Sequence, residues 1–542
     1  MHIDWQYYIF LFFPILGYAE VHYRFPFLPS FLFQKEPEIV FDLPLRAKLG
    51  RPVPLFLFVK DAHHFSIQTK KIEVGIKYLA EGTAETYQET YEEIIGGYFH
   101  SHAIQLSPKF FEREGLYQIE ARLFFKNGRK KNRVIAQDNY RGIKKHPFEI
   151  RIVHAPLPKT NNWYWGDLHI HSNFTDDQVE FGAPIRETAL AAQSLGLDFI
   201  AVTDHSYDLD DENGNFLKND AALPKWDGFQ QEVRAVQAKL QDFVIIPGEE
   251  VSVGNYRKEN VHCLVLNDQI FHPGKGDSAE ELFQNQPTLS LEELLSDISE
   301  GAIAIAAHPA ETPPFSQQII LRRGEWDKTD CSRPEIRTLQ ILNGNDPATL
   351  LRGMELWKDL LLQGRHVGIA AGNDAHGNFN CYRQVSLPFL KMVYSKDHLL
   401  GKFRTAVYSR YLSLPDLLAS LRENRTLISS GPFATFQILK DDDKPAEIGD
   451  TFQTSGQIKM HIHARSIPEY GFWEEIILYF GIPEENREEA HTISIPYRKL
   501  DFSLQVDFQE LKAGYVRMEA YSKRGNDSYF CLSNPIWMTK EF

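Results

Sequence analysis

The pattern of hydrophobic and polar positions divides the chain into three parts. Between residues 36 and 153, β-rich runs such as EIVFDLPL and KIEVGIKYL are separated by glycine, proline and charged turns. Short alternating runs of this kind are typical of an antiparallel sandwich. We therefore expect an N-terminal β-sandwich-like domain over residues 1–155, followed by a linker at Pro156 and Pro158.

The middle of the chain alternates apolar runs with amphipathic stretches such as FQQEVRAVQAKLQ. The seven apolar runs are WYWGDLHIH, DFIAVTDH, FVIIPGEEVS, VHCLVL, AIAIAAHP, RTLQILNG and HVGIAAGNDAH. Strands that are apolar on both faces and covered by helices form parallel sheets. This part predicts an α/β fold, a distorted seven-stranded (β/α) barrel over residues 160–432.

Strand-like runs return after residue 432, among them FATFQIL and QIKMHIHAR. They predict a second β-sandwich over residues 433–542, at the C-terminal end of the chain. A chain of 542 residues is long enough for several separate cores.

The formal net charge of −15 argues against binding to a nucleic acid backbone, which needs a basic face. Four cysteines without CxxC spacing fit a reducing compartment and predict a cytoplasmic protein. The run from Tyr8 to Ala19 has the length of a signal-peptide core, so export is the alternative. Asp4 and the absence of Lys and Arg before this run argue against export, and it is too short to cross a bilayer.

Most of the central apolar runs end in side chains that can bind a metal. These are His169, His171, His205, Glu249, Glu250, His308, Asn343, Asp374 and His376. In parallel barrels the catalytic side chains gather at the carboxyl ends of the strands. His262 opens its run instead, but a hairpin with its turn in NYRKEN would bring it back beside Glu250.

The spacing of His169 and His171 places both imidazoles on one face of a strand, about 6 to 7 Å apart. A single buried histidine is more often structural than a ligand. Six histidines with three or four acids are too many for one ion, and burying them unpaired would cost several kcal/mol each. We therefore expect two or three divalent ions; this ligand chemistry suits Zn, Mn or Fe, among which the sequence does not choose.

Six motifs follow one another between Trp163 and Arg410. In order, they are DLHIHSNFTDD, AVTDHS, PGEEVS, VHCLVL, AAHPA and GNDAH. Together they resemble the PHP (polymerase and histidinol phosphatase) superfamily of metal-dependent phosphoesterases. RTLISSGP and CLSNPIWM resemble a branch related to carbaryl hydrolase, in which a β-domain follows the barrel. The resemblance implies a phosphoesterase, with carbamate ester hydrolysis as a second activity possible on the same scaffold.

The resemblance also implies three sets of metal ligands. They are His169, His171, Glu250 and Asp374 for one ion, Glu250, His262 and His308 for a second, and Asp176, His205 and His376 for a third. Glu250 is preferred to Glu249 because the family's bridging acid directly precedes a V-S-type pair, as Glu250 does before Val251 and Ser252. For the third ion, Asp177 is the alternative to Asp176.

The chain departs from the family at two places. Gln340 stands where relatives often have an acid, which predicts the loss of a contact that supports a metal ligand. The long acidic segment at residues 208–228 is either a substrate-selecting lid or a solvated loop.

The expected function is a multinuclear metal-dependent hydrolase that acts on a small phosphate ester through a metal-activated water. Glu250 and Asp374 are the expected catalytic ligands, with His205 as the acid for the leaving group. Arg383, Arg404 and Asn343 are the expected substrate contacts, although ion pairing is the ordinary role of such arginines.

Three alternatives remain at this stage. The same site could hydrolyse a carbamate or carboxyl ester, or the chain could be a non-catalytic binding module whose β-domains recognise a partner. A nuclease would need a basic track beside the site, which the acidic composition does not favour.

Overall fold

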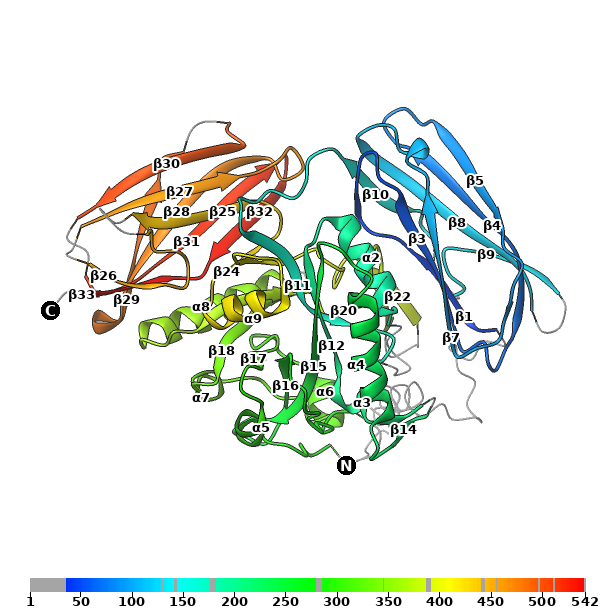
Figure 1. Ribbon diagram of the computed structural model, residues 1–542, viewed down its shortest axis with the longest axis horizontal. Coiled ribbons are helices and arrows are strands. Elements are labelled where there is room, and N and C mark those ends of the chain that lie inside the picture. Colours follow the sequence, from blue (N-terminus) through cyan, green and yellow to red (C-terminus); the bar gives the residue numbers. More distant parts are fainter. Residues whose placement is uncertain are drawn as a thin grey trace, which may run out of the picture.

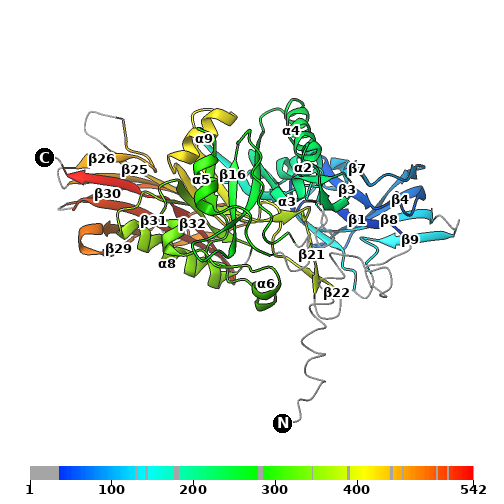
Figure 2. The ribbon, with the colours of Figure 1, turned by 90° about the horizontal axis from the view of Figure 1, so that it is seen from below.

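The computed structural model describes residues 36–540 apart from 128–130, 141–143, 176–181, 214, 279–284, 345, 387–390, 440–443, 455–456, 496–497 and 510–511. Strands account for 46% of these residues and helices for 17%. Two β-rich parts lie on either side of a central part that carries the helices (Figures 1 and 2). Within the described ranges, no helix is both long and apolar enough to cross a membrane. The run Tyr8–Ala19, considered above as a signal-peptide core, lies outside these ranges.

The N-terminal part consists of two packed sheets, which is consistent with the predicted sandwich. One has the order β1–β3–β7, with β1 Glu38–Asp42, β3 Val53–Lys60 and β7 Phe99–Leu106. The other has the order β2–β10–β8–β4–β5, with β2 Arg46–Lys48, β10 Phe148–Val153, β8 Gly115–Asn127, β4 Ile67–Tyr78 and β5 Ala84–Thr90; β6 (Ile94–Ile95) and β9 (Asn132–Ala136) pair at its sides. Alternate residues such as Phe41, Leu57 and Ile119 are fully buried between the sheets, as the two-residue period of a strand requires.

The central part is built on a sheet with the order β19–β18–β17–β16–β15–β12–β11–β23–β24. The strands are β11 Trp163–His171, β12 Phe199–His205, β15 Val244–Gly254, β16 Asn260–Leu266, β17 Ile303–Ala306, β18 Ile336–Asn343, β19 Gly368–Gly372, β23 Arg404–Tyr408 and β24 Thr426–Ser429. The short strand β20 (Ala375–His376) pairs with β11 in parallel. Two hairpins lie outside this sheet. One pairs β13 (Asp211–Glu212) with β14 (Asn215–Asn219), and the other pairs β21 (Tyr382–Ser386) with β22 (Lys391–Ser395).

Eight α-helices occur within the described ranges. They are α2 Ile185–Leu195, α3 Ser206–Leu209, α4 Pro224–Gln237, α5 Leu291–Asp297, α6 Phe315–Ile320, α7 Lys328–Cys331, α8 Pro347–Leu362 and α9 Leu414–Arg422. Helix α8 begins where the Asp346 side chain accepts a hydrogen bond from the Ala348 amide, which caps the first turn. It packs on the sheet through Trp357, which is fully buried. The acidic segment at residues 208–228 contains the β13–β14 hairpin and the first residues of α4.

The predicted α/β class, a distorted seven-stranded (β/α) barrel, is wrong for this chain. Strands outnumber helices strongly, and the helices α3, α6 and α7 have only four to six residues. Strand β16 runs antiparallel to both β15 and β17, so helices do not alternate regularly with parallel strands. The sheet also continues past β24 into the C-terminal part, as one sheet of sixteen strands. The flanking β-rich parts therefore set the class of the whole chain.

The C-terminal part packs a small sheet against the continuation of the central one. The small sheet has the order β25–β27–β30, with β25 Phe433–Leu439, β27 Ile458–Arg465 and β30 Asp501–Phe508. The continuation runs from β24 through β32 (Asp527–Ser533), β31 (Gly514–Arg524) and β28 (Phe472–Ile482) to β29 (Arg487–Ile493), with β26 (Thr451–Thr454) and β33 (Ile536–Lys540) beside it. The buried side chains of Phe436, Ile462 and Met518 belong to one core. This arrangement is consistent with the predicted second sandwich.

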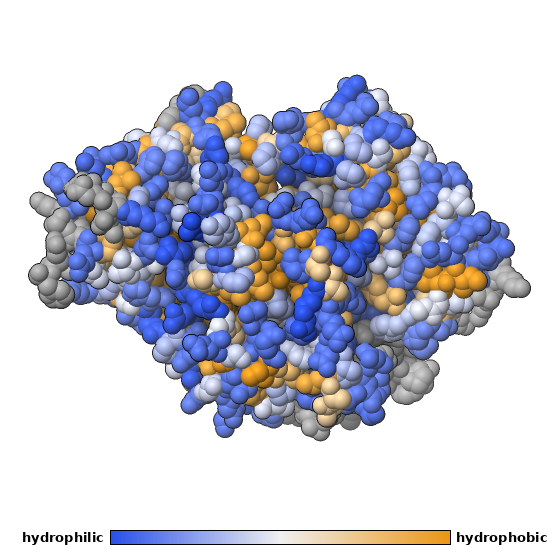
Figure 3. All heavy atoms as spheres, in the orientation of Figure 1, coloured by the Kyte–Doolittle hydropathy of each residue, from blue (hydrophilic) through white to orange (hydrophobic). Residues whose placement is uncertain are grey.

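The central and C-terminal parts are joined by hydrogen bonds as well as by the shared sheet. Asn534 Oδ1 accepts from the Ile369 amide at 2.7 Å, and Asn534 Nδ2 donates to Thr426 Oγ1 at 2.5 Å. Hydrophilic residues cover most of the surface, with apolar residues gathered near the middle of the face in Figure 3. The Asn534 side chain is fully buried, so this contact fixes the position of β19 against the C-terminal part.

Candidate metal centre

The ends of the central strands bring the predicted ligand residues together. His205 ends β12 opposite Glu250 of β15, and His171 ends β11 opposite His376 of β20. The predicted β15–β16 hairpin is present, with His262 opposite Ser252, two residues beyond Glu250. Figure 1 shows these strands side by side in the central part. Side chains that are far apart in the sequence are therefore held on a common sheet.

Glu250 lies at the middle of this cluster, with five imidazoles around its carboxylate. Its Oε1 atom lies 2.7 Å from His262 Nδ1, 3.2 Å from His308 Nε2 and 3.4 Å from His169 Nε2. Its Oε2 atom lies 3.0 Å from His205 Nδ1 and 3.5 Å from His171 Nε2. The Glu250 side chain is only 1% exposed, so solvent does not separate these groups.

Potential ligand atoms within 4.8 Å of one another form three groups among the described residues. They are His169, His171, Glu250 and Asp374; His205, Glu250 and His262; and His171, His205 and His376. The first group equals one of the sets that the family resemblance implies. His205 belongs to both the second and the third group, whereas the family resemblance places it in only one set of ligands. His308 is in none of the three groups, but its Nε2 lies near Glu250 Oε1. Asp176 and Asp177 lie outside the described residues.

The hydrogen bonds around His169 and His171 show which ring nitrogens face the cluster as acceptors. His169 Nδ1 lies 2.9 Å from Gln340 Oε1, an acceptor, so this nitrogen carries the proton. His171 Nδ1 lies 3.2 Å from Thr175 Oγ1. The Thr175 hydroxyl donates to Asp204 Oδ1 at 2.9 Å and can therefore only accept from His171. In the neutral rings, both Nε2 atoms are then left with lone pairs.

These lone pairs meet other acceptors. The two Nε2 atoms lie 3.1 Å apart, and Asp374 Oδ1 lies 3.0 Å from His171 Nε2 and 3.5 Å from His169 Nε2. Asp374 Oδ1 is buried and has no hydrogen-bond donor. Acceptors that converge on one point without a donor between them need a cation. The residues of this group therefore fit a divalent metal ion.

The pKa shifts reflect the same need for positive charge. Burial would raise the pKa of Glu250, but His262 and His169 outweigh it and hold that pKa well below its usual range. Burial alone would lower the pKa of His169, but Glu250 and Asp374 raise it to about 9. Burial, with His376 and His205, lowers the pKa of His171 to about 3. The carboxylates keep their charge and His171 is neutral, as a metal ligand must be, and a metal ion bound here would displace the proton that the raised pKa of His169 places on its Nε2.

The backbone at two predicted ligands is held in an unusual conformation. His308 has a φ of 32° and Asp374 a φ of 52°, both in the left-handed region that residues other than glycine rarely adopt. The Asp374 amide donates to the carbonyl of His169 at 2.9 Å, which fixes this turn against β11. Strain of this kind, on the order of 1–3 kcal/mol per residue, gathers at functional sites.

Gln340 supports a ligand, contrary to the expectation that this contact is lost. Besides its contact with His169, its Nε2 donates to Asn343 Oδ1 at 3.3 Å, and Asn343 Nδ2 donates to Asp374 Oδ2 at 3.4 Å. The amide oxygen of glutamine accepts the ring proton as a carboxylate would. Asn343, predicted as a substrate contact, is 7% exposed and holds a ligand carboxylate in place.

Glu249 points away from the cluster, since successive residues of a strand face opposite sides. Its Oε1 accepts from the His272 amide at 3.2 Å. Burial raises the pKa of Glu249 well above its usual range. The cluster therefore contains Glu250 and not Glu249, which is the preference expressed from the sequence.

Sequence reasoning missed two residues beside His262. His262 Nε2 and Arg323 Nη1 both lie 2.9 Å from Asp277 Oδ2 and 2.8 Å from each other, so an imidazole and a guanidinium meet at one buried carboxylate. His262, His308, Glu311, Gln317 and Arg323 are among the side chains that line a small pocket of about 20 Å³ at the edge of the cluster. Arg323 follows helix α6 in a stretch without strand character, and only its cationic side chain near the AAHPA motif could have indicated it.

The two arginines predicted to bind substrate lie elsewhere. Arg383 Nη1 pairs with Asp42 Oδ2 at 2.9 Å and its Nη2 donates to the Phe41 carbonyl at 3.0 Å, which ties the β21–β22 hairpin to the N-terminal sandwich. The guanidinium of Arg404 lies over the rings of Trp165 and Tyr470, with its carbon 5.7 and 5.6 Å from the ring centres. Neither has a contact with the cluster within the described ranges, so both expectations need correction: these side chains connect the parts of the molecule.

Comparisons with known proteins add little. No family model matches the chain, and no curated protein matches it. Among solved structures, a mutant β-glucosidase from Listeria innocua in complex with laminaribiose is 15% identical over 23% of this chain and 17% of that chain, with a TM-score of 0.14. The CARDB domain of a Pyrococcus furiosus protein, in complex with di-metal ions, is 15% identical over 22% of this chain and 96% of that chain, with a TM-score of 0.13. A Paenibacillus cycloisomaltooligosaccharide glucanotransferase is 8% identical over 92% of this chain and 70% of that chain, with a TM-score of 0.17. Similarity this low carries no argument about fold or function.

Proposed function

We propose that this protein is a multinuclear metal-dependent hydrolase that cleaves small phosphate esters. The observation that carries the proposal is the arrangement around Glu250, whose buried carboxylate lies within 3.5 Å of five histidine nitrogens. The order of the motifs, which resembles that of PHP metallohydrolases, supports the same activity and does not depend on a closed barrel.

The chain's own residues would hold and position the reacting groups. His169, His171, Glu250 and Asp374 offer one ion a set of nitrogen and oxygen ligands, and His262 and His376 offer ligands beside it. Divalent ions held there would acidify a water molecule and stabilise charge on the attacked ester. His205 ends its strand at 6% exposure, at the edge of the cluster, and would donate a proton to the leaving group.

Arg323 supports an anionic substrate. Its side chain is 20% exposed, it lines the pocket that contains His262 and His308, and it carries a permanent positive charge. A guanidinium matches two oxygens of a phosphate group. The proposed function therefore assigns to Arg323 the role that the sequence suggested for Arg383 and Arg404.

The test is a substrate screen on protein reconstituted with Zn, Mn or Fe and analysed for bound metal. The panel contains 4-nitrophenyl phosphate, bis(4-nitrophenyl) phosphate, a carbamate ester and a carboxyl ester. We expect turnover of a phosphate ester and its loss in His308→Ala together with at least one ion. His154→Ala, which changes an exposed histidine, is the matched control.

The possible outcomes separate the alternatives. Turnover of only the carbamate or carboxyl ester would keep the hydrolase and overturn the phosphate substrate. Bound metal without turnover of any ester would favour a binding module. Protein that binds no metal, or His308→Ala with full activity and metal content, would refute the proposal.

A further inference from the structure

One edge of the N-terminal sandwich carries a second group of side chains that can bind a metal. Tyr91 and Glu93 follow β5, which ends the order of one sheet, and His100 and His102 lie in β7, which ends the order of the other. Since alternate residues of a strand face the same side, both imidazoles share one face of β7. The three ligand groups of the metal centre come from residues 169–376, so this group is separate from them.

A tyrosine hydroxyl takes part here, unlike in the groups of the metal centre. Tyr91 Oη lies 2.6 Å from His100 Nε2 and 3.1 Å from Glu93 Oε2, and the latter two atoms lie 3.7 Å apart. Three possible ligand atoms therefore surround one point. Tyr91 is 5% exposed, whereas the side chains of His100 and Glu93 are 28% and 51% exposed, so an ion can reach this point from solvent.

The phenol ring of Tyr91 is held in place by its neighbours. The ring of His102 stacks on it, with centres 4.2 Å apart and planes 22° from parallel. His102 Nε2 lies 3.2 Å from Glu89 Oε1, and Tyr87 Oη donates to Glu89 Oε2 at 2.8 Å. These contacts fix the position of the Tyr91 oxygen before any ligand binds.

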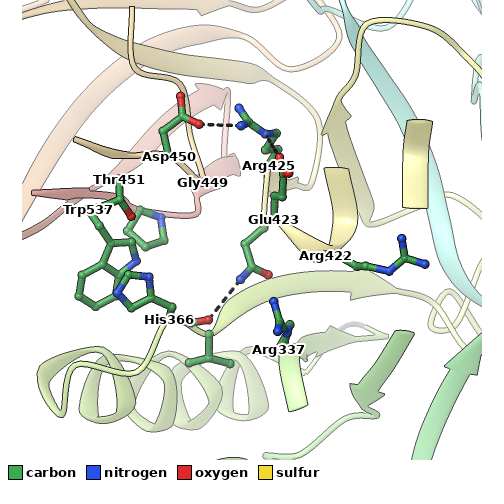
Figure 4. Close-up of a pocket in the computed structure, with 12 residues that line it drawn as sticks. Arg337, His366, Arg422, Glu423, Arg425, Gly449, Asp450, Thr451 and Trp537 are labelled. Atoms are coloured by element: carbon green, nitrogen blue, oxygen red, sulfur yellow. Dashed lines mark hydrogen bonds and ion pairs between the residues drawn. The ribbon is translucent and has the colours of Figure 1, made fainter. Parts of the chain in front are cut away.

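The two carboxylates at this edge have no basic partner among the described residues. Glu89 and Glu93 pair with imidazoles and with neither a lysine nor an arginine. In the cavity shown in Figure 4, by contrast, both carboxylates, Glu423 and Asp450, pair with Arg425. A cation bound at the edge of the sandwich would supply the positive charge that these glutamates lack.

Protons alone can also join the three groups, with the His100 ring donating to the Tyr91 oxygen and the hydroxyl donating to Glu93. Burial, together with Glu93, raises the pKa of Tyr91, so the phenol keeps its proton without a cation. On metal binding, a bond forms between the ion and the phenol oxygen, the O–H bond breaks, and the proton leaves to solvent. Nitrogen and oxygen ligands bind Cu(II) most tightly among the divalent ions of the first transition row.

We propose that Tyr91, Glu93 and His100 bind a divalent transition metal ion, Cu(II) most tightly, at the edge of the N-terminal sandwich. Because the ligands follow β5 and lie in β7, the ion would link the two sheets, and its binding would stabilise the folded state. This proposal does not depend on the proposed hydrolase activity.

The test is a titration of the full chain with Cu(II) after its metal centre has been loaded with Zn. We expect one added copper per chain by elemental analysis, and a visible absorption band from charge transfer between phenolate and copper. Tyr91→Phe should remove the band. Glu93→Gln should weaken copper binding at least about tenfold, since even the partners of metal ligands contribute that much. Tyr87→Phe, which removes a neighbouring hydroxyl, is the matched control and should keep both the band and the affinity.

The other outcomes would overturn the proposal. They are a band that persists in Tyr91→Phe or that Tyr87→Phe also removes, copper that binds without a phenolate band, and copper that only displaces zinc from the metal centre. Circular dichroism checks that the variants are folded. If Tyr91→Phe does not fold, Glu93→Gln at its exposed position decides, and unchanged copper affinity in that variant would refute the site.

Discussion

His169 Nδ1 meets Gln340 Oε1 at 2.9 Å, deep below the metal cluster. This contact fixes the ring so that its other nitrogen faces Glu250 and Asp374 as an acceptor. We therefore predict that Gln340→Leu lowers the affinity for metal about 10- to 100-fold. Gln340→Glu, which keeps an acceptor oxygen, should retain most of it. Competition with a chromophoric chelator measures both affinities; Gln363→Leu, at an exposed position after α8, is the control. Unchanged affinity in Gln340→Leu would contradict this role.

Substitution of Glu250 should lower the metal content of the protein, whereas the same substitution at the neighbouring Glu249 should not. Glu250→Gln removes the charge shared by five imidazoles and should cost the protein at least one bound ion. Glu249→Gln should keep every ion, because that side chain faces the other side of β15, where burial raises its pKa. Elemental analysis of folded protein, checked by circular dichroism, gives the comparison. Equal losses in both variants would mean that the effect is one of folding.

The charge of Arg323 should matter for anionic substrates alone. Arg323→Gln should raise the KM for a phosphate ester about 10- to 100-fold, since one guanidinium contact with phosphate contributes about 1.5–3 kcal/mol. The KM for a neutral carboxyl ester should stay within about threefold. Steady-state kinetics at fixed metal occupancy measures both. If the KM rose equally for both substrates, Arg323 would act through Asp277 and His262 and not by binding the substrate.

Arg383 should prove important for stability and not for catalysis. Its ion pair with Asp42 is buried, with 6% and 0% of the two side chains exposed, and breaking such a pair from one side costs about 3–5 kcal/mol. Arg383→Met should therefore lower the free energy of unfolding in urea by about that amount, while kcat/KM per folded molecule is unchanged. Adding Asp42→Asn should recover part of the loss. A stable variant with a raised KM would instead support the substrate role that the sequence suggested.

Glu447 should make the protein less stable as the pH rises. Burial and the Asp450 carboxylate raise its pKa to about 7 against the effect of Arg425. Between the unfolded pKa of about 4.5 and this value, the folded state binds more protons than the unfolded state, so stability falls with increasing pH. The expected loss is on the order of 1–2 kcal/mol after allowance for partial exposure.

Urea unfolding at pH 5 and pH 8 measures this effect against Glu447→Gln, which cannot ionise. The variant should gain stability relative to the unchanged protein as the pH rises. A difference between the two proteins that is constant over this range would show that Glu447 does not titrate on unfolding.

The sequence predicted the residues of the cluster better than the fold around them. The alternation of a strand is a local rule, and it placed His169 and His171 on one face. The preference for Glu250 over Glu249 came instead from the family resemblance. The β15–β16 hairpin likewise followed from the turn residues near Asn255. The class of the fold depends on pairing over long distances, and the joining of β24 to β32 leaves no trace in the hydrophobic pattern of either strand.

The arginines show the same limit. The sequence does not distinguish the roles of Arg383, Arg404 and Arg323. Only the packed structure decides which of them lies near His262. Gln340 shows the limit of a family pattern, because an amide oxygen meets the ring of His169 where an acid was expected.

The hydrogen bonds between β24 and β32 mean that the C-terminal sandwich is not a detachable module. A version of the protein shortened after Pro432 would leave β24 as a bare, apolar edge strand, and such edges recruit strands of other molecules. Shortened versions intended to isolate the metal centre should therefore keep the chain through β33, because without it they will aggregate whatever the chemistry of the cluster.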